Sequence, residues 1–214
     1  MSYKFPEGGK FLFSNTLATA KILATMTNAN PTVGTSVAHG FVDGDELLIS
    51  SGWEDATDSV FRADMLTADT VSLLGLDTSS TNLFTAGAGD GSTARKISAW
   101  VEVPQVLTIG TSGGDVRSAT INPVFRRNGI NRPLGFNPSV ITLELAHDAS
   151  NAAYQTMLGI SRVFGLVAFK LLLADGSASY GYGYMNVSEV PKVSAGNPNA
   201  VTAVFSAQGR TISY

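Results

Sequence analysis

The sequence contains no cysteine and only two histidines among its 214 residues. The absence of cysteine excludes a disulfide framework and a zinc site with thiolate ligands, and it argues against a small secreted domain held together by disulfides. His39 and His147 alone are too few for a metal site based on imidazole ligands. We therefore expect neither a metal ion nor a cofactor.

Long apolar runs and an apolar leader are also missing. No stretch approaches the roughly 20 apolar residues of a membrane-spanning helix. The N-terminal residues Met1–Glu7 lack the apolar core of a secretory signal peptide. We expect a protein that is not inserted in a membrane and that is made in a cytoplasm, where it stays or is packed into something assembled there.

Charged residues make up only 14% of the chain, whereas globular proteins average about 25%. A surface so poor in charge is either solvated by Ser, Thr, Asn and Gly or becomes an interface, and we expect both here. The abundant Thr and Val also favour strands over helices, because β-branched side chains fit a pleated surface. The composition predicts a mainly β protein that assembles with copies of itself.

The few charges are unevenly distributed along the chain. Between Ile22 and Ala94 there are ten acidic residues and one basic residue, Arg62, so this segment carries −9. Because the whole chain carries −3, the flanking residues carry +6. The asymmetry predicts two bodies, and the acidic one is a poor candidate for binding the phosphates of a nucleic acid.

We place the acidic body at 22–96, as a small all-β domain inserted into a larger domain formed by 1–21 and 97–214. Its short strand-like runs, separated by turn residues, are typical of a small barrel or sandwich: Thr32–Val37, Glu46–Ile49, Phe61–Met65 and Val71–Leu74. The segment Ala86–Ser92 has the composition of a flexible linker. Linker-like segments at the edges of the insert favour a domain that decorates the outside of an assembly.

The larger domain is expected to be a β-sandwich or barrel with one packed α-helix. Val140–Leu145 predicts a strand, and a helix is expected to follow over 149–158. Asp148 precedes the helical pattern as a candidate N-cap, and Gly159 follows it as a candidate end. Small and apolar residues share one face of this helix, so we expect it to pack against a sheet.

The C-terminal part predicts a hairpin and a closing strand. Leu166–Ala174 is the most apolar strand, and Asp175-Gly176 is a strong turn signal. A final strand alternates over 201–208. The return strand of the hairpin carries three tyrosines on one face: Tyr180, Tyr182 and Tyr184. With no Lys or Arg between Asp175 and Val190, we favour an aromatic ladder against the helix or at a subunit contact over the stacking of nucleic-acid bases.

Two short patterns resemble functional motifs but lack their context. Gly110-Thr111-Ser112-Gly113-Gly114 matches the G-x-S-x-G pattern of serine hydrolases, which requires a helix directly after the serine. No helical pattern follows, and His147 lies at a strand-to-helix junction. Asp43-Gly44-Asp45-Glu46 resembles part of a calcium loop without its twelve-residue spacing, so we interpret it as a β-turn. We expect no catalytic residue and no enzyme.

The segment Val116–Phe136 predicts a long, irregular loop. A loop of this length in a compact domain is usually functional or disordered. It is rich in arginine: Arg117, Arg126, Arg127 and Arg132. These side chains suit bidentate binding of phosphate, pairing with acids of a neighbouring subunit, or simple solvation of the loop. Because charge is scarce elsewhere, we favour pairing between subunits.

Two stretches resemble a known family. Phe169–Gly176, followed by Tyr182–Val187, resembles the C-terminal hairpin of the major tail tube protein of long-tailed bacteriophages, with its acidic-glycine turn and aromatic return strand. Ala29–Asp45, with the pair His39-Gly40 and the turn Gly44-Asp45, is similar to the small β-barrel modules inserted in phage structural proteins.

The resemblance implies a structural subunit of the virion that forms hexameric rings stacked into a hollow tube. It implies a long loop that reaches a neighbouring subunit or ring, a role that falls on Val116–Phe136 and its arginines. It also implies a lumen through which DNA passes without sequence-specific binding during ejection. The implied partners are further copies of the chain, a tape measure protein, and tail terminator or tail tip proteins. An outward insert would collide with a contractile sheath, so we favour the flexible, non-contractile tail of a siphovirus.

Other interpretations remain open at this point. A tail terminator or a decoration protein would belong to the same class of phage structural subunits. A carbohydrate-binding β-sandwich would use Trp53, Trp100 or the tyrosine strand. A serine hydrolase has the least support.

Overall fold

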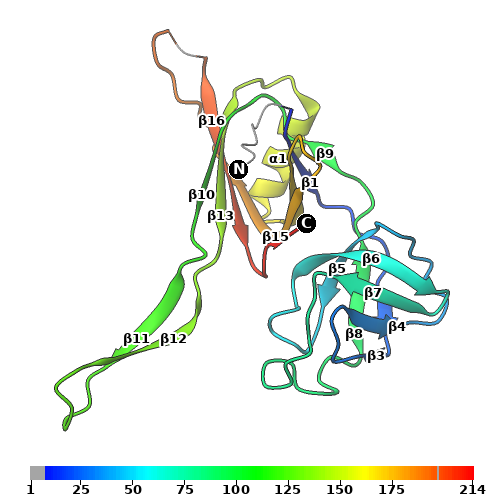
Figure 1. Ribbon diagram of the computed structural model, residues 1–214. Coiled ribbons are helices and arrows are strands. Elements are labelled where there is room, and N and C mark those ends of the chain that lie inside the picture. Colours follow the sequence, from blue (N-terminus) through cyan, green and yellow to red (C-terminus); the bar gives the residue numbers. More distant parts are fainter. Residues whose placement is uncertain (1–7, 197) are drawn as a thin grey trace.

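The computed structural model describes residues 8–196 and 198–214. It is mainly β, with three antiparallel sheets and, among the described residues, a single α-helix (Figure 1). This confirms the mainly β class with one packed helix.

The first sheet has eight strands and contains most of the C-terminal half of the chain. Its order is β10-β13-β16-β15-β14-β1-β9, with β17 beside β15. The hairpin predicted at Asp175-Gly176 joins β14 to β15, where Leu172 pairs with Ala178. The strands are β1 (Lys10–Ser14), β9 (Val101–Glu102), β10 (Val106–Ser112), β13 (Val140–Ala146), β14 (Leu166–Leu172), β15 (Ala178–Val187), β16 (Ala200–Ala207) and β17 (Ile212–Ser213).

Helix α1 (Ala152–Arg162) packs on one face of this sheet. Met157 of the helix and the rings of Phe11, Phe169 and Phe205 are fully buried between them. The ring centroids of Phe11 and Phe205 are 4.8 Å apart. Burial of these side chains, worth about 2 kcal/mol each, holds the helix on the sheet.

The helix begins later and ends later than the sequence predicted. Asn151, not Asp148, is the N-cap, and its side chain accepts hydrogen bonds from the backbone N–H groups of Ala153 and Tyr154. Asp148 accepts instead from Ser150 in a local turn before the helix. Gly159 lies inside the helix and does not end it. Both Asp148 and Asn151 are good cap residues, and the sequence pattern alone favoured the wrong one.

The second sheet contains seven strands in the order β2-β8-β5-β6-β7-β4-β3. Its two end strands, β2 and β3, follow each other in the chain, and the N–H of Ala24, which links them, donates to the Thr35 carbonyl of β4, so the sheet is a nearly closed barrel. Leu47, Phe61 and Leu73 fill its interior. The strands are β2 (Lys21–Leu23), β3 (Thr25–Met26), β4 (Thr32–Thr35), β5 (Glu46–Ser50), β6 (Ser59–Thr67), β7 (Thr70–Leu74) and β8 (Ser92–Lys96).

The glycine-rich segment Ala86–Ser92 is not a linker but a packed part of this barrel. A Cβ added to Gly89 would lie 2.7 Å from the ring of Trp53. Asp90 Oδ1 accepts from the Met26 N–H at 2.8 Å, and the Gly91 N–H donates to the Leu23 carbonyl at 2.9 Å. Gly89 serves close packing, and Gly87 and Gly91 adopt the positive φ of turns, so the segment is an ordered part of the barrel and not the flexible linker expected from its composition.

The third sheet is a two-stranded hairpin that projects from the ends of β10 and β13 (Figure 1). It consists of β11 (Val116–Ile121) and β12 (Ile130–Phe136), and we call the segment 116–136 the arm. The prediction of an irregular loop over this segment is therefore wrong, because Val116 pairs with Phe136 and Ile121 pairs with Ile130. A bulge beside Arg117 disguised the strand alternation in the sequence.

Candidate assembly surface

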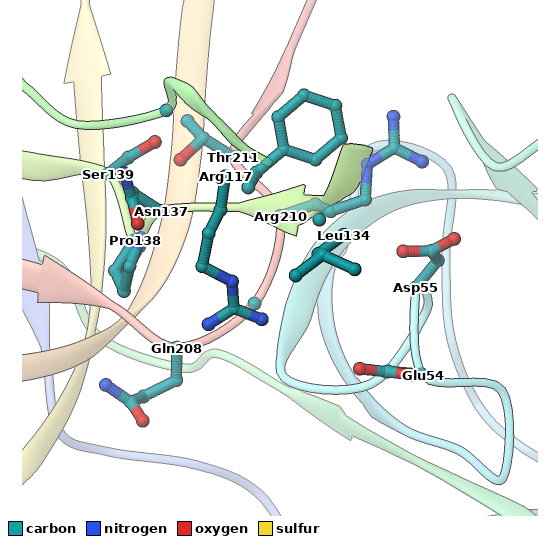
Figure 2. A pocket seen from close by; sticks show the side chains of 15 residues that line it. Glu54, Asp55, Arg117, Leu134, Asn137, Pro138, Ser139, Gln208, Arg210 and Thr211 are labelled. Carbon is teal, nitrogen blue, oxygen red and sulfur yellow. The ribbon is translucent and has the colours of Figure 1, made fainter. Parts of the chain in front are cut away.

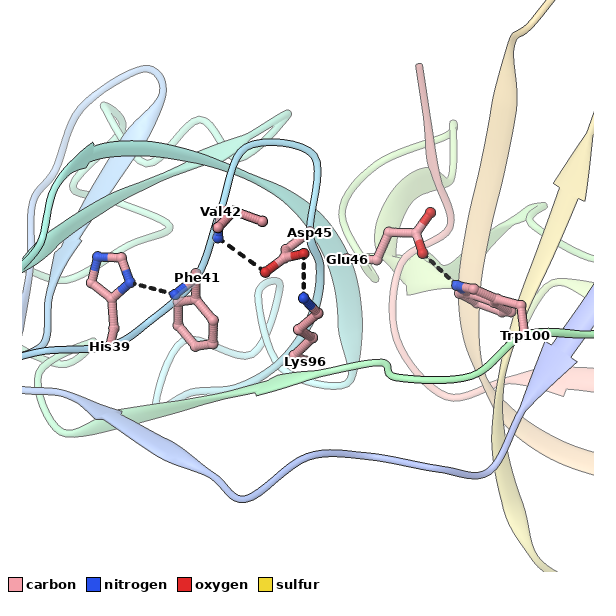
Figure 3. A network of polar contacts seen from close by, with 7 residues as sticks. All are labelled: His39, Phe41, Val42, Asp45, Glu46, Lys96 and Trp100. Atoms are coloured by element: carbon pink, nitrogen blue, oxygen red, sulfur yellow. Dashed lines mark hydrogen bonds and ion pairs between the residues drawn. The ribbon is translucent and has the colours of Figure 1, made fainter.

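The two large sheets are joined by a charged network at their contact, of which Figure 3 shows Glu46 and Trp100. Lys170 Nζ of β14 lies 2.6 Å from Glu46 Oε1 of β5, and both side chains are mostly buried. The indole N–H of Trp100 donates to the other carboxylate oxygen of Glu46. The Lys170 ammonium also lies over the rings of Trp100 and Tyr180, at 5.5 and 5.2 Å from their centroids. Each charge at this contact therefore has a fixed partner.

An apolar cluster surrounds this network. Leu48 and Val60 of the second sheet pack with Ala168, Ala178 and Tyr180 of the first. Burial raises the pKa of Tyr180, and its hydrogen bond with the Glu46 carboxylate raises it further. The shared cluster fixes the two sheets against each other, because separating them would expose it to water.

The C-terminal residues complete the contact. Ile212 is buried in the core of the second sheet, although its strand, β17, pairs with β15 of the first. The Tyr214 hydroxyl accepts from the Arg62 N–H at 3.0 Å and donates to the Leu74 carbonyl at 2.5 Å. Burial raises the pKa of Tyr214. The end of the chain thus anchors the second sheet to the first.

The tyrosine strand faces this contact and not the helix, which corrects one of our two interpretations of it. Tyr180 is buried, Tyr182 is half-buried and Tyr184 is exposed, all on the face opposite α1. Gly181 points to the helix side, where an added Cβ would lie 2.3 Å from the ring of Phe169. Gly181 therefore leaves room for the phenylalanine core, whereas Gly183 allows the close approach of β16, since an added Cβ would lie 1.9 Å from the Ser206 carbonyl oxygen.

The arm carries the four arginines singled out in the sequence, all of them exposed: Arg117, Arg126, Arg127 and Arg132. None forms an ion pair within the part of the chain that the structure describes. Lys10, Lys96, Arg162 and Lys170, by contrast, each lie within 2.8 Å of a carboxylate oxygen. The structure places the arginines along one projecting element rather than in one cluster.

Exposed apolar side chains on the arm escaped the sequence analysis. Phe125 and Val124 at the tip are 101% and 91% exposed, and Leu134 and Phe136 on β12 are also exposed. A half-buried strand alternates apolar and polar residues, and that alternation would have identified the arm strands in the sequence. The arm lacks it because both of its faces are exposed. The adjacent Val124 and Phe125 form an exposed apolar tip, separate from Leu134 and Phe136 at the base of the arm, and such a tip is suited to contact another surface.

Arg117 lies apart from the tip, at a cleft of about 470 Å³ at the base of the arm (Figure 2). Arg117 and Arg210 line this cleft together with Glu54 and Asp55 of the second sheet. Leu134 adds an apolar wall. The charges of the cleft are mixed, so it has no strong preference for either sign.

The motifs that resembled catalytic and calcium sites have structural roles here. Gly113 and Gly114 have positive φ and form the bend after β10, where an added Cβ on Gly113 would lie 2.0 Å from the Pro138 carbonyl oxygen. Strand β11 follows, not the helix that a serine nucleophile needs. Asp43 accepts from the Met65 N–H, and Asp45 accepts from the Val42 N–H and pairs with Lys96 (Figure 3). No group of metal-binding side chains occurs among the described residues.

The two tryptophans proposed for carbohydrate binding are not presented to solvent as a platform, and of the tyrosine strand only Tyr184 is exposed. Trp53 is 2% exposed, packs edge-on against Phe84 and donates its indole N–H to the Thr85 carbonyl. Trp100 is half-buried beneath the Lys170 ammonium. Sugar rings stack on exposed aromatic faces, and neither tryptophan offers one.

Within residues 8–196 and 198–214, the structure has no helix with the length and apolarity needed to cross a bilayer.

Comparison with known proteins gives one family. The family model described as phage tail tube protein matches residues 51–214, from the second sheet through the arm to the C-terminus. No curated protein matches the chain significantly.

Proposed function

Because the chain belongs to the phage tail tube protein family, a family of structural proteins of the virion tail, we propose that it forms stacked hexameric rings around a lumen that conducts DNA. The single observation that best supports this polymerisation is the arm. It projects from the sheet, it is apolar and cationic at its tip, and its four arginines have no acidic partner within the described part of the subunit. A second copy supplies both the acids and the apolar cover.

We propose that Arg117, Arg126, Arg127 and Arg132 act in contacts between subunits. An arginine that pairs with a carboxylate across an interface gains a charge-assisted hydrogen bond. In the free subunit the arginine is exposed to water, so no desolvation cost arises before assembly. The apolar residues beside them supply the water-excluding part of the contact.

Sheet edges supply a second kind of contact in the proposed ring. Strand β10 ends the order of the first sheet and pairs with β13 alone. Leu107 and Ile109 on β10 are 47% and 43% exposed. An uncovered edge with apolar side chains promotes pairing with another chain, so this edge is suited to join neighbouring subunits in a ring.

The finer parts of the proposal rest on the family. They are passage of DNA through the lumen without sequence-specific binding during ejection, and contacts with a tape measure protein and with tail terminator or tail tip proteins. We also propose assembly in the host cytoplasm and a non-contractile, siphovirus-type tail.

The proposal is tested by removing two charges from the arm tip. We expect the variant Arg126→Ala/Arg127→Ala to assemble at least tenfold more slowly than wild type in light scattering, with unchanged thermal unfolding of the subunit. The control Lys10→Ala/Lys192→Ala removes two exposed cations elsewhere and should assemble like wild type. Equal assembly rates of the two variants would show that the arm arginines only solvate the hairpin.

A further inference from the structure

The charges of the chain are divided between two exposed bodies. The arm contains four arginines and no acid, so it carries +4, whereas the second sheet with its loops, residues 21–96, carries −6. The remaining residues carry −1 in total. Within the subunit, Figure 1 shows the arm tip and the second sheet apart, at different ends of the molecule. The strongest electrostatic complement of the arm is therefore the second sheet of another copy.

The arm tip has a defined shape and chemistry. The Arg126 N–H donates to the Pro123 carbonyl at 3.1 Å, which closes a turn at the end of the hairpin. This turn presents Val124 and Phe125 to solvent, followed directly by Arg126 and Arg127. A partner must therefore offer an apolar recess with carboxylates at its edge.

The second sheet has such a recess, which we call the apolar depression. It is a shallow hollow of about 320 Å³, and its lining includes His39, Phe41, Val42 and Met65. His39 and Phe41 are buried beneath it with ring centroids 5.1 Å apart. Figure 3 shows His39 and Phe41 on one side of Asp45 and Lys96, with Trp100 on the other.

Exposed apolar side chains gather around this depression. Val42 and Met65, which line the depression, are 54% and 43% exposed, and Val37, which precedes Ala38 of the lining, is 85% exposed. Val37 and Val42 on the loop between β4 and β5, together with Met65 on β6, form an apolar patch that water solvates poorly, and an aromatic anchor from a partner is a suitable cover.

Two carboxylates stand at the edge of the patch. Asp43 Oδ1 accepts from the Met65 N–H at 2.7 Å, and Asp69 Oδ1 accepts from the Ala38 N–H at 2.8 Å. Both residues are exposed, and these bonds hold their carboxylates in place. A carboxylate has about four acceptor positions, so each keeps capacity for an arginine.

The cleft at the base of the arm is the rival receiving surface, and its charges decide against it. Arg117 and Arg210 line it beside Glu54 and Asp55, so an incoming Arg126 or Arg127 would meet like charges as well as acids. The lining of the depression contains no lysine or arginine, and the one lysine bonded to it, Lys21, donates to the Ala38 carbonyl at 3.5 Å.

We propose that the apolar depression of one subunit receives the arm tip of a neighbouring copy, with Phe125 in the depression and Arg126 and Arg127 beside Asp43 and Asp69. The tip and the depression are different surfaces, so the contact is heterologous and repeats from copy to copy, as a stacked tube requires. This inference rests on the proposed polymerisation, and it gives the second sheet a role as receptor.

Disulfide trapping tests the contact, since the chain has no cysteine of its own. A Val124→Cys variant with a small mass tag is mixed with Val37→Cys, and the mixture is oxidised during assembly. The control partner is Leu83→Cys, which is 69% exposed on the same body but outside the patch. All three positions are exposed, so the variants should fold, and circular dichroism verifies this.

We expect the tagged-to-untagged cross-link with Val37→Cys to exceed that with Leu83→Cys at least tenfold. Addition of 1 M salt before oxidation should reduce it, because the arginine contacts are screened. If tubes form but the Val37→Cys cross-link is not enriched over the Leu83→Cys cross-link, the depression is not the receptor of the arm tip, and the proposed function is unaffected. A subunit that stays monomeric would overturn both.

Discussion

Lys170 and Glu46 are 124 residues apart in the chain, yet their side chains form a 2.6 Å ion pair that joins the first sheet to the second. The pair is shielded from water, lies among Trp100 and Tyr180, and is surrounded by apolar residues. It makes the second sheet part of the same packed body as the first. The remaining predictions examine this coupling and the assembly that it supports.

Breaking the pair from one side should destabilise the subunit. The variant Lys170→Met leaves the Glu46 carboxylate in a mostly buried site with only the neutral donors Trp100 and Tyr180 beside it. We expect a loss of roughly 3 kcal/mol in the free energy of unfolding, measured by urea denaturation, since an uncompensated buried charge is costly.

The exposed pair Lys10–Glu102 is the matched control, with both side chains about half exposed. Lys10→Met should change the free energy of unfolding by less than about 1 kcal/mol, as is usual for surface ion pairs. A double variant Lys170→Met/Glu46→Leu should recover most of the lost stability. Similar small effects of Lys10→Met and Lys170→Met would show that the sheet contact is solvated.

Alkaline pH should weaken the same contact through Tyr180 and Tyr214. Burial raises the pKa of both hydroxyls above their usual value of about 10 in the folded subunit. The folded state therefore holds protons that the unfolded state releases, and stability is full below pH 10 and falls as the pH rises further.

We expect the thermal midpoint to drop between pH 10 and pH 11, and to drop less in the variant Tyr180→Phe/Tyr214→Phe. At neutral pH the double variant should be less stable than wild type, because the Tyr214 hydroxyl joins the Arg62 N–H to the Leu74 carbonyl. An identical alkaline drop in both proteins would assign it to other groups.

Glycine substitutions distinguish a packed segment from a linker. Gly89→Ala places a Cβ 2.7 Å from Trp53, whose indole is fixed by its bond to Thr85, so we expect a loss of about 1–3 kcal/mol in unfolding free energy. Gly159→Ala is the contrasting variant, because Gly159 lies inside α1 with no atom within 4 Å of the added Cβ. It should gain about 0.5–1 kcal/mol. A neutral Gly89→Ala would favour the linker interpretation.

The sequence predicted those features that depend on neighbouring residues. The hairpin at Asp175-Gly176 followed from its turn chemistry, and the class followed from composition and alternation. The start of α1 did not, because Asp148 and Asn151 are equally suited to cap a helix and only tertiary packing selects between them.

Features that depend on distant contacts were outside the reach of a single sequence. The glycines near Gly89 have a linker composition, and only the indole of Trp53 reveals why they are small. The tyrosine face was recognised, but its orientation depends on which side of the sheet α1 occupies. The arginines of the arm were found from composition, whereas the exposed Phe125 beside them became informative only when the hairpin placed it at a tip.

The central claim is that this chain polymerises by itself. The most direct measurement is electron microscopy of the purified wild-type protein over a series of increasing concentrations. We predict rings and then tubes of constant diameter. A protein that remains monomeric at the highest concentration, with its sheets folded by circular dichroism, would contradict the claim.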